Sequence, residues 1–93
     1  MDIAAQIKNY IGDEALAAVS ATNVQPFDDI DTPGLQFDVE VNRRQLRVIV
    51  TLQPTEAYKV YVFDPATMET IRDEPDVDAQ HLAETINTLE VTL

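Results

Sequence analysis

Apolar side chains recur at every second position in two runs near the middle of the chain: Leu35, Phe37, Val39 and Val41, then Leu46, Val48, Val50 and Leu52. A two-residue period is typical of a strand with one buried face. Residues 42–45 between the runs predict a four-residue hairpin loop, which places Val41 opposite Leu46 and Glu40 opposite Arg47. The two runs therefore predict an antiparallel hairpin with all its apolar side chains on one face.

Residues 58–63 predict a third strand that is apolar on both faces, and hence either central in a sheet or covered on its second side. Tyr58 and Tyr61 point to opposite faces of it, so one is expected in the core and the other on the surface as a candidate partner contact. Residues 64–67 predict a turn and residues 68–72 a short fourth strand, which Pro75 stops.

Helical patterns flank these strands. Ile3, Ile7 and Ile11 lie on one helical face with Asp2 as N-cap, and Gly12 is placed to end that helix or break it before a second segment that starts at Asp13. Near the C-terminus, Asp78 is expected to cap a helix whose buried face includes Ala79, Leu82, Ala83, Ile86 and Leu89, with Val77 stapled onto Leu82.

The predicted fold is a single α+β domain over residues 1–93, in which an N-terminal helix, a three- to four-stranded antiparallel β-meander and a C-terminal helix packed on the sheet follow one another. Its segments are a helical part at 1–21, an acidic loop at 22–34, the sheet at 35–72 and the helix at 77–90. The strand at 35–41 and the loop before it bring several carboxylates close together in sequence.

Charge changes the functional picture. Asp and Glu number 17 against 6 Lys and Arg, a net charge of −11, and residues 1–33, 34–63 and 64–93 carry −5, +1 and −7. Such acidity favours either a surface that meets a positive partner or a surface adapted to high salt. It disfavours direct binding to nucleic acid or to anionic membranes. Apolar runs are too short to span a bilayer, and the start of the chain lacks a signal-peptide pattern, so a cytoplasmic location is expected.

Candidate chemistry is sparse. Asp29, Asp31, Gly34 and Glu40 partly match a calcium-loop spacing, but Pro33 occupies a ligand position and a strand follows. The cluster Asp73, Glu74, Asp76 and Asp78 fits helix capping and solvation better than a metal site. The chain has no cysteine, and His81 and Ser20 are its only histidine and serine, which gives no nucleophile, base and orienting group together. We therefore expect no enzyme activity, no metal and no cofactor.

One local pattern is similar to a known family. The run Val60-Tyr-Val-Phe-Asp-Pro-Ala-Thr-Met-Glu-Thr-Ile-Arg-Asp-Glu-Pro75, followed by Leu82-Ala83, resembles the C-terminal part of FlaG-type flagellar accessory proteins. The chain departs from them in Met68, where a turn glycine is usual, and in an extra strand after Phe37. The resemblance implies a strand, turn, strand, helix unit, and no function is carried over from it.

The function predicted from the sequence is that of a non-enzymatic, acidic protein-binding module. We expect a small inhibitor that presents a DNA-like anionic surface to a nucleic-acid-binding protein, of the phage or mobile-element anti-defence type such as anti-CRISPR proteins. The expected partner-binding residues are all acidic: Asp28, Asp29, Asp31, Asp38, Glu40, Asp73, Glu74 and Asp76. The alternative is a structural or assembly module of a halophile-adapted or phage protein, with a homodimer left open.

Overall fold

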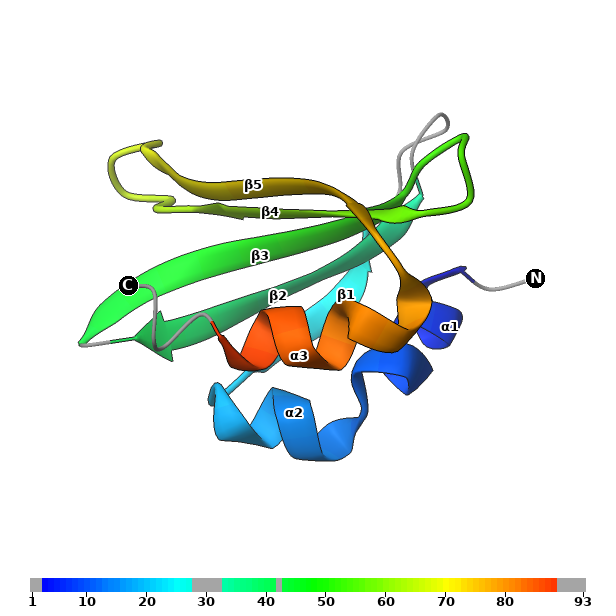
Figure 1. Ribbon diagram of the computed structural model, residues 1–93. Helices are drawn as coiled ribbons and strands as arrows, with labels where there is room; N and C mark the ends of the chain where they lie inside the picture. Colours follow the sequence, from blue (N-terminus) through cyan, green and yellow to red (C-terminus); the bar gives the residue numbers. More distant parts are fainter. Residues whose placement is uncertain (1–2, 28–32, 42, 89–93) are drawn as a thin grey trace.

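The computed structural model describes residues 3–27, 33–41 and 43–88 (Figure 1). In chain order its elements are α1 (Ile3–Ile11), α2 (Asp13–Ala18), β1 (Thr22–Phe27), β2 (Gly34–Val41), β3 (Arg44–Leu52), β4 (Tyr58–Phe63), β5 (Thr70–Val77), the 3-10 turn η1 (Ala79–His81) and α3 (Leu82–Asn87). The predicted α+β class is confirmed, with an N-terminal helix, an antiparallel sheet and a C-terminal helix. The sheet has five strands instead of three or four.

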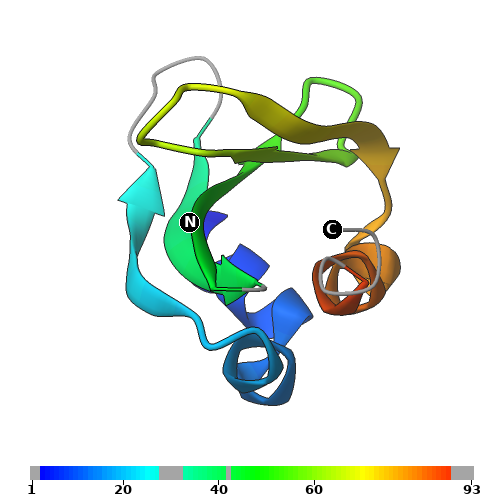
Figure 2. The same cartoon turned by 90° about the vertical axis from the view of Figure 1, so that its left-hand side faces the viewer.

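The five strands form an antiparallel meander in the order β1-β2-β3-β4-β5. The sheet is strongly curved, and the three helices lie across its concave side (Figures 1 and 2). One face of the sheet therefore packs on helices and the other, convex face is turned to solvent. This two-layer arrangement buries the apolar face that the alternating pattern provides.

Burial follows the alternation closely. Phe37, Val48, Val50, Val60 and Val62 are fully buried. Ile7 of α1 and Leu82 and Ile86 of α3 close the core from the helical side. Gly34 begins β2 where the strand passes close to β3. A Cβ atom at this position would overlap the carbonyl oxygen of Val50, so the close approach requires glycine. The apolar positions predicted for β2 and β3 are thus confirmed as core.

The register of the β2–β3 hairpin differs from the expected one. Val41 pairs with Arg44 and Asp38 pairs with Arg47, so the connection is two residues long and Glu40 lies opposite Gln45. Arg43 has a φ of 66°, the left-handed conformation that tight hairpin connections require. The shift is two residues, and side chains alternate with the same period, so the apolar face is unchanged while the charge pairing across the strands moves.

Two predicted boundaries were wrong. Residues 22–27 form strand β1 at one edge of the sheet instead of belonging to a loop. Strand β5 continues through Pro75 to Val77, at the opposite edge. The β4–β5 register shifts between Tyr58 and Val60, the stretch that lies opposite Pro75. An edge strand tolerates proline because its outer side needs no ladder hydrogen bond.

The helix predictions held in part. The predicted interruption of the helix at Gly12 is confirmed, because α1 ends before this residue and α2 follows directly after it. Gly12 has a φ of 85°, a conformation that favours glycine. Asp78 stands at the start of η1, but its side chain makes no capping hydrogen bond, and the regular helix runs only over Leu82–Asn87. Asp2 and Leu89 lie outside the described residues.

Candidate acidic docking surfaces

The acids predicted for β2 lie on the convex face of the sheet. The Asp38 carboxylate accepts a hydrogen bond from Arg47 Nε at 2.9 Å and a longer one from Asn23 Nδ2 at 3.4 Å. Its charge is therefore matched within the fold. Glu40 is exposed and has no ion-pair partner in the part of the chain that the structure describes. Asp28, Asp29 and Asp31, which were predicted to extend this strip, lie outside the described residues.

The acids predicted for the C-terminal part are not brought together. Asp73 lies on the convex face opposite Tyr61, with its carboxylate 3.5 Å from Lys59 Nζ. Glu74 pairs across the sheet with Val60 and so faces the helical side, where it accepts a hydrogen bond from Arg72 at 2.6 Å. Asp76 is exposed, and its backbone N–H donates to Gln53 Oε1 at 2.9 Å. These acids and those of β2 do not form one continuous strip.

Arg44, which the sequence pattern assigns to the hairpin loop, is the first residue of β3 and links two parts of the sheet. Its Nε donates to Asp64 Oδ2 at 2.9 Å and its Nη2 to Glu69 Oε2 at 3.2 Å, which ties the start of β3 to the β4–β5 turn. Two hydrogen bonds hold the pKa of Asp64 below its usual range. The larger effect comes from the backbone N–H of Ala66 and the next from the Arg44 side chain. Hydrogen bonding to Asp64 in turn raises the pKa of Arg44.

The convex face also carries an apolar patch. Ile49 and Tyr61 are paired across β3 and β4, and the rings of Tyr61 and Phe63 meet edge to face with centroids 5.3 Å apart. Each of the three is partly exposed. Tyr58 is buried on the other face, as predicted for one of the two tyrosines. The patch lies between the Asp38–Arg47 and Lys59–Asp73 ion pairs, so this face is nearly neutral.

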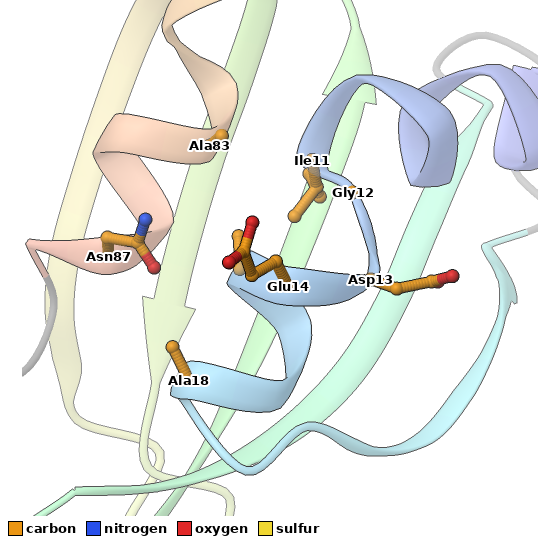
Figure 3. A pocket seen from close by; sticks show the side chains of 8 residues that line it. Ile11, Gly12, Asp13, Glu14, Ala18, Ala83 and Asn87 are labelled. Carbon is orange, nitrogen blue, oxygen red and sulfur yellow. The ribbon is translucent and has the colours of Figure 1, made fainter.

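A groove of about 550 Å³ lies between α2 and α3. We call it the α2–α3 groove. Ala15, Ala18 and Ala83 form an apolar part of its lining, and Asn87 stands on the α3 side (Figure 3). The Glu14 side chain extends toward α3 (Figure 3). The groove exists because alanine side chains are too short to fill the space between the two helices.

Charge distinguishes this groove from the sheet. Asp13 and Glu14 contribute to its lining, and none of the lining residues that the structure describes is Lys or Arg. Over the described residues, neither these two acids nor Glu84 of α3 has an ion-pair partner. Lys8 of α1 lines a separate pocket against β1. The sequence pattern did not predict this groove, since it marks Asp13 only as the start of a second helical segment.

The metal-ligating side chains of the described residues do not gather at one place. Among them, no group of three or more His, Asp or Glu side chains could hold a metal ion. Gly34 and Glu40, from the calcium-loop pattern, are the first and seventh residues of an extended strand, so they lie about 20 Å apart. His81 Nδ1 stands 3.7 Å from Asp78, with both side chains more than half exposed.

Comparison of the chain with protein-family models, with curated proteins and with solved structures found no match. Within the described ranges, every helix is too short or too polar to span a lipid bilayer. The fold and the surfaces above therefore carry the functional argument.

Proposed function

We propose that this protein is a non-enzymatic, acidic protein-binding module that presents carboxylates to a basic surface of a partner protein. The observation that carries the proposal is the α2–α3 groove, whose lining, among the residues that the structure describes, combines alanine with Asp13 and Glu14 and includes no basic side chain. Carboxylates without an internal partner retain their full attraction for an external cation. A net charge of −11 adds long-range steering toward a positive partner and makes binding depend steeply on salt.

The finer form of the proposal is that the partner is a cytoplasmic nucleic-acid-binding protein and that this chain inhibits it, as phage or mobile-element anti-defence proteins such as anti-CRISPR proteins do. A basic groove shaped for phosphates attracts carboxylates by the same electrostatics. Glu14, Asp13 and Glu84 are the described acids best suited to this role. Asp38 contributes less, because a partner would have to displace Arg47 from it.

A structural or assembly module is the second candidate, and one observation favours it. The convex face places Ile49, Tyr61 and Phe63 between ion pairs, which gives an apolar center with a nearly neutral surround. Such a patch suits a lasting protein contact more than a charge-driven encounter.

Affinity capture from a lysate of the source cells at low salt, followed by elution with a salt gradient, tests the first proposal. Two triple variants each remove three negative charges: Asp13→Asn with Glu14→Gln and Glu84→Gln, and Glu40→Gln with Glu56→Gln and Asp76→Asn. A nucleic-acid-binding protein that is released steeply by salt, and is lost only from the first variant, supports the proposal. Equal retention by both variants contradicts it, and capture of this chain alone favours assembly.

A further inference from the structure

We propose that the α2–α3 groove binds a basic, amphipathic helix of a partner protein. This inference rests on the proposed function and names the kind of segment that the groove takes. Helix-in-groove binding requires an apolar floor, room for close approach of a third helix and charges that match the partner's polar face.

Geometry gives the first two requirements. Ala18 and Ala83 face the space between α2 and α3 (Figure 3). Helices pack with axes about 8–10 Å apart, and the shorter distances need small side chains at the contact. The volume of about 550 Å³ leaves room for apolar side chains of a docked helix. An apolar stripe of a docked helix could therefore rest on these alanines.

Charge complementarity selects the occupant. Helices α2 and α3 carry Asp13, Glu14 and Glu84, and no Lys or Arg is present in either. Lysine and arginine can lay their aliphatic stems along an alanine floor while their charged ends reach carboxylates at the rim. A second copy of this chain fits poorly, because pairing of two such grooves would place Glu14 near the like charges of its counterpart.

A titration of the full-length chain followed by amide chemical shifts tests the inference. The probe is a synthetic peptide of about 14 leucine and lysine residues in amphipathic helical order, roughly 21 Å long. A peptide of the same composition in scrambled order and the small cation spermidine are the controls. We expect the amphipathic peptide to bind more tightly than either, with shifts that cluster at Gly12, Ala15, Ala18 and Ala83.

Variants give matched comparisons. Ala18→Leu fills the groove and should weaken peptide binding about tenfold or more, whereas Ala17→Leu, on the same helix but outside the groove, should not. Glu14→Gln should weaken peptide binding about two- to fivefold. Glu56→Gln, which removes the same charge from a distant turn, should weaken peptide binding less. Both alanines are exposed, so both leucine variants are expected to fold.

The outcomes separate the two proposals. Peptide binding that maps to the convex face, or that responds equally to Glu14→Gln and Glu56→Gln, overturns the groove but leaves an acidic protein-binding module. Equal affinity for the amphipathic and scrambled peptides also overturns the groove. Failure of every cationic probe to bind at low salt overturns the groove and the proposed function together.

Discussion

Neutralising Arg47 tests the register of the β2–β3 hairpin and, with it, the charge pairing on the convex face. Arg47 Nε lies 2.9 Å from Asp38 Oδ1, and the two side chains are 33% and 27% exposed. Glu40 lies opposite Gln45, diagonal to Arg47. We therefore expect Arg47 to be energetically coupled to Asp38 and not to Glu40.

The magnitude follows from geometry and exposure. A hydrogen bond to a charged group contributes about 1.5–3 kcal/mol when well protected, and an exposed ion pair about 0.2–1 kcal/mol. Both side chains are about a third exposed, so we expect a coupling of about 1 kcal/mol between Asp38 and Arg47. A diagonal partner about 7–8 Å away should give less than about 0.3 kcal/mol, within the additivity of independent sites.

Urea unfolding of Asp38→Asn, Glu40→Gln, Arg47→Gln and the two double variants provides both cycles. The Asp38 cycle should give the larger coupling free energy, and a loss of 1 kcal/mol should lower the melting temperature by about 4–8 °C. If the Glu40 cycle gives the larger value, the chain uses the four-residue loop and the register described here is wrong. Equal, near-zero couplings would show that the Arg47–Asp38 ion pair adds no stability to the fold, against the estimate from its geometry.

Three further variants probe other parts of the fold. Ile86→Ala, at a fully buried position of α3, should lower the free energy of unfolding by about 2–5 kcal/mol in calorimetry, and a loss below about 1 kcal/mol would mean that α3 is not packed on the core. Met68 has a φ of 62° and a 71% exposed side chain, so Met68→Gly should raise stability by about 0.5–1 kcal/mol in urea, whereas a lower midpoint would contradict the turn geometry. Because the folded pKa of Asp64 is lowered, its carboxylate stabilises the fold above the unfolded pKa and loses that effect as pH falls through the folded value. The deficit of Asp64→Asn in thermal melts should therefore be largest near neutral pH and shrink in acid, and a deficit independent of pH would refute this account.

The sequence predicted the elements whose buried side chains recur at a regular spacing along the chain. Strands β2 and β3 alternate because one of their faces is the core, and the break at Gly12 follows from its conformation. Strand β1 has no such pattern, since most of its side chains are exposed and pairing with β2 holds it in place. Proline reliably ends a strand only where both sides of the strand are hydrogen-bonded. Pro75 lies in β5, which is an edge strand and therefore tolerates it.

The α2–α3 groove could not be predicted in the same way. Its walls, α2 and α3, are separated by most of the chain. They meet because α1, which leads directly into α2, covers the same concave face of the sheet as α3 (Figure 1). An alanine at an exposed helical position gives no local signal, since alanine is the best helix former whether or not it borders a cavity. The groove is a product of tertiary packing and appears only when α2 and α3 are placed side by side.

Charge along the sequence and charge on the surface differ for a related reason. The nearly neutral segment 34–63 supplies the bases that the meander places next to acids of the C-terminal segment: Arg44 beside Asp64 and Glu69, and Lys59 beside Asp73. The same strands match Arg47 with Asp38. Folding therefore neutralises much of the acidity that composition assigns to the sheet, whereas α2 and α3 lie beyond the reach of those bases. A partner attracted by carboxylates should accordingly find them on the helical side.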